Sequence, residues 1–390
     1  MHYGLRLALS SFGALAFVAA CSSTNSLVAD AGTNKCGPLT CASEAAGSAL
    51  TKAAFAACSS CTAPNIQPPL TCADQKPIKA CCAYLPTPSG SLASATGLHY
   101  NSGVDPKTVD LSCLDDPGPQ GTPQTVTLTG YVKLFSSGDD SSGVKIEIFQ
   151  EGANGALGAL VGMAVVTKDS DAFQSPKPTW SSKCPTDGCT LRKFSYPGIP
   201  TETPLIIKTS DAAAAQKWSE LYDYNIYFAN GKIGQNGAAA GEVRYDPSAV
   251  AATDINAVAS AAGGFTIKPD KGVIAGEIHD CADVKLAGAV VNTDYRPEGS
   301  MLYFDSNESN PLPNSQQSAT PVLGLFGAIN YPTGVPIRVS AVGRLPVTGG
   351  TGGDGGATCG DIALVGTYVV QVFPGAVTAF SLRGRRPYQK

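Results

Sequence analysis

A pattern of strands and glycines that occurs twice in the chain constrains the fold most. The sequence Leu-Thr-Gly-Tyr-Val surrounds Gly130, and Ile-Ala-Gly-Glu-Ile surrounds Gly276. The next strand begins after Gly143 in the first copy and after Gly288 in the second, thirteen and twelve residues beyond those glycines. Self-similarity at a nearly fixed spacing indicates a duplicated structural unit.

The repeat continues with an aromatic residue and two prolines. In the first copy, Phe194 is followed by Pro200 six residues later and by Pro204 four residues after that. The second copy keeps both offsets with Phe326, Pro332 and Pro336. We interpret the two copies as duplicated β-modules, because chance does not account comfortably for so many matched positions.

Apolar and polar residues alternate within each copy, as in half-buried strands. Gly and Pro number 43 and 28 of 390 residues, which favours turns and short strands over long helices. The alternation predicts strands at 125–134, 144–148, 160–167, 205–209 and 224–229. Helices are expected at 43–58, 210–222 and 246–262. Residues 362–380 are apolar, but their alternation around Pro374 and Gly375 predicts a β-hairpin and not a membrane span.

The order of these features resembles the carboxypeptidase regulatory-like domain, a prealbumin-like β-sandwich. In the first copy the resemblance is carried by Gly130, Gly143, Phe194 and residues 197–200, and a loop with Cys184 and Cys189 departs from it. In the second copy it is carried by Gly276, Gly288, residues 324–326 and residues 332–336. The resemblance implies accessory modules without catalytic residues.

We therefore predict a mainly β protein with two tandem β-sandwich modules. The first module spans 123–264 and contains insertions, and the second spans 265–390. A disulfide-rich region with a linker, 21–122, precedes them, and residues 1–20 are expected to be a signal peptide.

The start of the chain has the composition of an export signal. Arg6 precedes an apolar stretch at 7–18, which is too short to cross a bilayer and ends in small residues before Cys21. The sequence Val-Ala-Ala-Cys resembles the lipobox of bacterial lipoproteins, so we expect lipidation of Cys21; a plain secretory signal is the alternative. The two serines after Cys21 lack the Asp of an inner-membrane retention signal. We expect a cell-envelope protein anchored by lipid in the outer membrane.

Cys21 apart, twelve cysteines remain, an even number that indicates disulfides in an exported protein. We predict bridges within each region, Cys184 with Cys189 and Cys281 with Cys359. Zinc binding is the less favoured reading of the cysteines in the N-terminal region. The connectivity of that group stays open; its members are Cys36, Cys41, Cys58, Cys61, Cys72, Cys81, Cys82 and Cys113.

The sequence contains no motif for an activated nucleophile, a metal cluster or a phosphate-binding loop. His279, beside Asp280 at the end of a strand, fits a bystander better than a proton relay. Trp180 and Trp218 are candidates for stacking on a ligand, although packing in the core is the more common role. A net charge of -4 does not favour binding to the phosphates of nucleic acid. We predict no catalytic residue, no cofactor and no metal.

The function predicted from the sequence is a non-catalytic envelope lipoprotein at the cell surface. Its partners would be the membrane, through the lipid anchor, and a glycan or protein of the envelope or its exterior. An exported hydrolase with an unrecognised carboxylate site and a purely structural spacer are the alternatives. A pair of carboxylates in a cleft would favour the hydrolase, and an exposed apolar patch would favour the binding protein.

Overall fold

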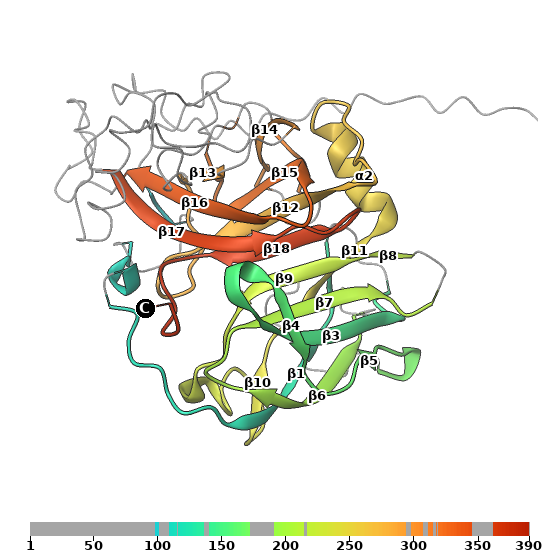
Figure 1. Ribbon diagram of the computed structural model, residues 1–390, viewed down its shortest axis with the longest axis vertical. Helices are drawn as coiled ribbons and strands as arrows, with labels where there is room; N and C mark the ends of the chain where they lie inside the picture. Colours follow the sequence, from blue (N-terminus) through green and yellow to red (C-terminus); the bar gives the residue numbers. More distant parts are fainter. Residues whose placement is uncertain are drawn as a thin grey trace, which may run out of the picture. The chain divides into compact units, whose positions relative to one another are not determined.

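The computed structural model describes residues 98–100, 109–114, 116–135, 140–171, 191–213, 217–293, 298–306, 311–314, 317, 319–344 and 362–389. Several sequence predictions lie outside these residues, namely those for Cys21, the helix at 43–58, Cys184, Cys189, Cys359 and Trp180. The described part is mainly β, as predicted (Figure 1).

The first module contains two groups of paired strands, and in each group a central strand lies between two neighbours. In one, β1 (Thr125–Tyr131) lies between β10 (Glu242–Arg244), which is parallel to it, and β6 (Lys193–Pro200), which is antiparallel. In the other, β7 (Leu205–Asp211) lies between β3 (Val144–Glu151) and β9 (Leu221–Ile226), both antiparallel. Apolar side chains from both sheets form one buried cluster, as in a sandwich; it includes Leu128, Tyr196, Ile146 and Ile207.

The second module repeats this arrangement of six strands. Here β12 (Lys271–Ile278) lies between β18 (Val377–Leu382), which is parallel, and β15 (Leu325–Pro332), which is antiparallel. In the other sheet, β16 (Pro336–Arg344) lies between β13 (Val290–Thr293) and β17 (Ile362–Gln371), both antiparallel.

The register of the strands agrees with the repeat in the sequence. Gly130 is the partner of Phe194 in the first module, and Gly276 is the partner of Phe326 in the second. The strands also end alike, because Thr125 pairs with Pro200 and Lys271 pairs with Pro332. The repeated residues therefore occupy equivalent structural positions.

The paired glycines are required by a neighbouring strand. A β-carbon at Gly130 would lie 1.9 Å from the carbonyl oxygen of Tyr245, and one at Gly276 would lie 2.4 Å from that of Phe380. Only glycine allows backbones to approach this closely. The repeat thus marks the point where a parallel strand packs against the centre of each sheet.

The two modules share a sheet, which the sequence did not predict. Strand β18 pairs in parallel with β9, with Val377 opposite Leu221 and Phe380 opposite Tyr224. This pairing produces a nine-stranded sheet in the order β14, β15, β12, β18, β9, β7, β3, β4, with β5 also on β3. The shared sheet is visible where β18 lies beside β9 (Figure 1).

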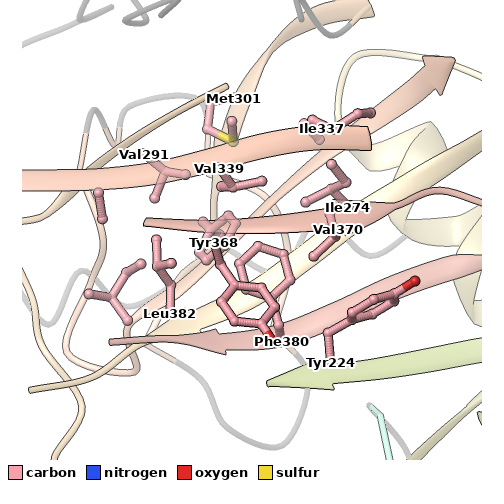
Figure 2. Packing of buried hydrophobic residues seen from close by; sticks show 14 of the residues in the cluster. Tyr224, Ile274, Val291, Met301, Ile337, Val339, Tyr368, Val370, Phe380 and Leu382 are labelled. Carbon is pink, nitrogen blue, oxygen red and sulfur yellow. The ribbon is translucent and has the colours of Figure 1, made fainter. Parts of the chain in front are cut away.

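The core also crosses the module boundary. Tyr224 of β9 belongs to the buried cluster of the second module, together with Ile274, Tyr368 and Phe380 (Figure 2). The rings of Phe380 and Tyr368 have centroids 6.3 Å apart. The two modules therefore share part of their core as well as a sheet.

Of the remaining elements, three strands form a separate small sheet, three strands extend the edges of the nine-stranded sheet, and the others lie outside any sheet. These remaining elements are β2 (Lys133–Leu134), β4 (Leu157–Leu160), β5 (Val165–Val166), β8 (Trp218–Ser219), β11 (Ser248–Ala251), β14 (Glu298–Tyr303), the helix α2 (Ala252–Ala261) and short 3-10 turns that include η4 (Ala153–Gly155) and η6 (Asn230–Lys232). Among the described residues, no helix is both long and apolar enough to span a membrane.

Four predictions of local structure were wrong. The predicted strand at 160–167 is interrupted, because residues 161–164 belong to no strand and only β4 and β5 pair with β3. Residues 210–222 are not a helix where described, because this stretch supplies the end of β7, β8 and the start of β9, whose side chains are all buried. Helix α2 begins at Ala252 and not at 246, because Ser248–Ala251 pairs as strand β11 with β2 and β8. The predicted hairpin at 362–380 is absent, because β17 pairs with β16 while β18 pairs with β12 and β9.

Candidate functional site

The disulfide of Cys281 joins the second module to the segment before the first. Cys281 is bonded to Cys113, with their Cα atoms 5.7 Å apart and a sequence separation of 168. The predicted Cys281–Cys359 bridge is therefore wrong. The prediction assumed that each region closes its own bridges, whereas residues 112–114 fold as a 3-10 turn against the C-terminal segment, where a β-carbon at Gly384 would lie 2.3 Å from Cys113 Sγ.

His279 belongs to a group of charged side chains at the end of β12. Its Nε2 atom lies 2.9 Å from Glu277 Oε2, and Lys285 Nζ lies 3.0 Å from Glu277 Oε1. Burial opposes ionisation of Glu277, but the hydrogen bond to His279 and the charge of Lys285 hold its pKa well below the usual range. The carboxylate of Glu277 is thus ionised and engaged on both oxygens.

Asp280 does not form the proton-relay pair with His279 that was weighed from the sequence. Asp280 is fully buried and accepts hydrogen bonds from the Tyr100 hydroxyl at 2.6 Å and from the amides of Ala282 and Val284. These bonds close the turn that carries Cys281. The role of Asp280 in this arrangement is structural.

The arginines near the C-terminus are packed against the two modules. The side chains of Arg383 and Arg386 are 9% and 16% exposed. Arg383 pairs with Asp283, and Arg386 Nε lies 3.4 Å from Asn225 Oδ1 on β9. Burial by itself would raise the pKa of Asp283, but the nearby charges of Arg386 and Arg383 hold this pKa below its ordinary value. Arg383 and Arg386 are therefore engaged in contacts with the turn after β12 and with β9.

Among the described residues, two carboxyl groups have a pKa near neutrality, those of the half-buried Glu151 and the buried Asp223. Burial raises the pKa of Glu151 to about 7, although a hydrogen bond from Tyr368 opposes the shift. Burial likewise raises the pKa of Asp223 to about 7, against a hydrogen bond from Tyr245. A pKa in this range suits general acid–base catalysis, so these are the residues to examine for a hydrolase.

The surroundings of both carboxyl groups are those of structural contacts. The hydroxyl groups of Tyr368 and Tyr388 are hydrogen-bonded at 2.9 Å, and the Tyr388 hydroxyl donates to Asn225 Oδ1 at 3.1 Å. Glu151 therefore belongs to a chain of hydrogen bonds between the modules. Asp223 is itself only 8% exposed. No group of three or more potential metal ligands occurs among the described residues.

Trp218 does not present its ring to a ligand. The residue is 5% exposed, its Nε1 atom donates to the Ser142 carbonyl at 3.3 Å, and Lys217 Nζ lies 4.5 Å from the ring centroid. The candidate role in stacking was wrong for this residue, because the ring fills the core of the first module.

An exposed apolar segment at the end of the shared sheet is the strongest candidate for an interaction site. Residues 156–166 read Ala-Leu-Gly-Ala-Leu-Val-Gly-Met-Ala-Val-Val, and every one of them is at least partly exposed. Leu160 is 46% exposed, Met163 83% and Val166 38%. Soluble proteins rarely expose contiguous apolar side chains without a partner. The sequence predicts a strand at 160–167 but no interaction site; the absence of polar side chains from eleven consecutive residues is the signal that points to one.

Comparison with known proteins gives no family for the chain. No family model matches it, and no curated protein matches it. A mutant form of the major pilin from Streptococcus pyogenes is 9% identical, with a TM-score of 0.14 over 66% of this chain and 98% of that one. The SpaE basal pilin from Lactobacillus rhamnosus GG is 10% identical, with a TM-score of 0.15 over 64% and 91%. A C-terminal fragment of the pilus adhesin SpaC from the same organism is 10% identical, with a TM-score of 0.15 over 67% and 97%. TM-scores this low carry no functional argument.

Proposed function

We propose that the protein is a non-catalytic interaction module of the cell envelope, held to the outer membrane by a lipid on Cys21. The observation that carries the interaction role is the exposed apolar segment 156–166. It supports this role because Leu160, Met163 and Val166 expose large apolar side chains within one short segment. The membrane anchor rests on the sequence before Cys21.

The arrangement of charged groups supports a role without catalysis. Glu277, Asp283 and Asp280 each bind side chains or amides of neighbouring elements. Such contacts consume the hydrogen-bonding capacity that a substrate would need. The carboxyl groups with a near-neutral pKa, Glu151 and Asp223, are bound by tyrosines between packed strands.

A co-sedimentation experiment tests the interaction role. The Cys21→Ser chain, purified without lipid, is mixed with washed cell-envelope fragments and pelleted, and Leu160→Glu is compared with it. We expect the parent chain to pellet and Leu160→Glu to remain in solution, because a charge in the apolar segment must be desolvated on binding. Leu312→Glu is the matched control, since Leu312 is also a large hydrophobic residue, 38% exposed, at another place in the fold.

An exported hydrolase is the second candidate, favoured by the raised pKa of Glu151 and Asp223. The same purified chain is incubated with cell-wall glycan and with peptide substrates. Turnover that is abolished by Glu151→Gln or Asp223→Asn, with retained folding, would replace the binding role by an enzymatic one.

A further inference from the structure

The segment 156–166 lies at one end of the shared sheet. Strand β4 pairs with β3, with Leu160 opposite Phe149 and Leu157 opposite Glu151, and β5 pairs with β3 as well. Among the described residues β4 has no strand on its other side, because it is the last strand in the order of the sheet. An edge strand turns alternate amide and carbonyl groups outward, where another strand can pair with them.

The segment is held in place in the single chain. A β-carbon at Gly158 would lie 2.7 Å from the carbonyl oxygen of Gln150, and Gly162 has a φ of +66°. The hydroxyl of Tyr196 donates to the Val161 carbonyl at 2.5 Å, and the Val161 amide donates to Ile148 at 2.7 Å. A surface that is already ordered loses little conformational entropy when it binds.

The sequence of β4 complements itself in an antiparallel arrangement. A two-fold axis between Gly158 and Ala159 would place Leu157 of one copy opposite Leu160 of the other, and Gly158 opposite Ala159. The small residues at the centre permit close approach of the two backbones, and the leucines flank them on both sides. An interface of this kind uses the same patch on both copies and closes as a dimer.

The charges around the segment also favour a second copy. No charged residue occurs from 152 to 167, and the nearest ones are Glu151 and Lys168. Natural edge strands are usually protected from self-pairing by charged side chains, and β4 lacks this protection. Two copies would bring no like charges together across the axis.

The edges of β17 and β10 are less suited to self-pairing. Strand β17 is covered at its edge, since a β-carbon at Gly155 would lie 2.7 Å from the carbonyl oxygen of Val369 and one at Gly366 would lie 2.1 Å from that of Arg383. On β10, the carbonyl of Glu242 already accepts a hydrogen bond from the Gly234 amide at 2.8 Å.

We infer that two copies of this chain associate through antiparallel pairing of their β4 strands, with Leu160, Met163 and Val166 flanking the seam. The inference rests on the interaction role proposed for the same segment and names its partner. In this dimer every surface outside the seam is present twice, once on each copy.

Sedimentation equilibrium of the full Cys21→Ser chain tests the inference at concentrations from about 1 to 200 µM. We expect a monomer–dimer equilibrium in the parent chain. Ala159→Glu and Ala159→Lys should each weaken the dimer at least about tenfold, because like charges would meet beside the axis, and an equimolar mixture of the two variants should restore it. Leu312→Glu should dimerise like the parent chain, and circular dichroism should show that all variants are folded.

Three outcomes would overturn the inference. The parent chain could remain monomeric over the whole range, or its dimer could be insensitive to both Ala159 variants. In the third outcome, the monomer binds vesicles of phosphatidylethanolamine and phosphatidylglycerol, and Leu160→Glu abolishes this binding. The partner of the segment would then be a lipid surface. If the parent chain is strictly monomeric but still binds the envelope, the second copy is not the partner of the segment, and the proposed function is retained. Loss of both activities would remove both.

Discussion

Tyr224 and Phe380 are register partners in one parallel strand pair, although they belong to different copies of the repeat. The strand that carries Phe380, β18, corresponds to β10 of the first module, since both pair in parallel with the glycine-containing strand of their own module. In the first module β10 ends its sheet, whereas β18 continues to β9. The duplicated fold therefore uses one of its two equivalent edges to join the modules.

Substitution of the paired glycines should destabilise the fold strongly. Gly130→Ala would place a methyl group 1.9 Å from the Tyr245 carbonyl oxygen, and Gly276→Ala would place one 2.4 Å from that of Phe380. The strands would have to separate, at a cost of about 2 to 3 kcal/mol or more in the free energy of unfolding. Denaturant unfolding monitored by circular dichroism measures the change.

Gly231→Ala is the control for the paired glycines. Nothing lies within 4 Å of a β-carbon at Gly231, so its free energy of unfolding should stay within about 1 kcal/mol of the parent value. Equal stability of Gly130→Ala and Gly231→Ala would contradict the close approach of the parallel strand.

The repeat made much of the fold predictable. Matched offsets from Gly130 and Gly276 depend on local geometry, and the register of both modules agrees with them. Pairings that join distant segments were not predictable, because strand alternation shows which face is buried but not which strand lies alongside. This explains why 362–380 was assigned to a hairpin, and why the pairing of β18 with β9 was missed.

The site was predictable only in part, for a related reason. Parity of cysteines indicated disulfides but assigned Cys281 to the wrong partner, because chain folding brings Cys113 across 168 residues. The burial of Trp218 depends on the packing of β8. This strand has only two residues, too few for an alternation of apolar and polar side chains to reveal it in the sequence. Residues 156–166 were not predicted as an interaction site, although their lack of polar side chains is visible in the sequence.

Peptide mapping under non-reducing conditions should recover Cys113 linked to Cys281. Since this pair removes one cysteine from the N-terminal group of eight, seven remain there and Cys359 has lost its predicted partner. If Cys184 pairs with Cys189, parity then links Cys359 to one of those seven. Mass spectrometry of alkylated digests measures both links, and a free thiol at Cys359 would contradict the second.

Removal of the Cys113–Cys281 bridge should lower stability. The double variant with serine at both positions lacks a cross-link over 168 residues, and loss of a native bridge of this kind costs about 2 to 5 kcal/mol. Denaturant unfolding with and without reductant measures the effect. The parent chain should become as unstable as the double variant or more so when reduced, and an unchanged double variant would show that the bridge constrains nothing.

Lipidation of Cys21 should place the protein in the membrane fraction. Intact-mass analysis should show a mature chain that begins at Cys21 and carries acyl groups, since burial of methylene groups provides the anchor. Cys21→Ser should appear in the soluble fraction without the added mass. An unmodified parent chain in the soluble fraction, or an anchored Cys21→Ser chain, would refute the anchor.

The stability of the fold should fall as the pH rises through neutrality. Burial raises the pKa of Glu151 and of Asp223 to about 7, above the ordinary values of 4.5 and 3.8. Between the ordinary and the raised values, the folded chain holds protons that the unfolded chain has released, so protonation stabilises the folded state. This contribution is complete at acidic pH and is lost as the pH passes about 7.

Glu151→Gln and Asp223→Asn test this dependence, because each keeps a hydrogen-bond acceptor for its tyrosine but does not ionise. We expect both variants to lose less stability than the parent chain between about pH 5 and pH 9, measured by urea unfolding at each pH. Asp270→Asn is the control, since the Asp270 side chain is 73% exposed. A parent profile that rises over this range, or variants whose profiles follow the parent, would show that neither carboxyl group is protonated in the fold, because only a proton held in the folded state gives this slope.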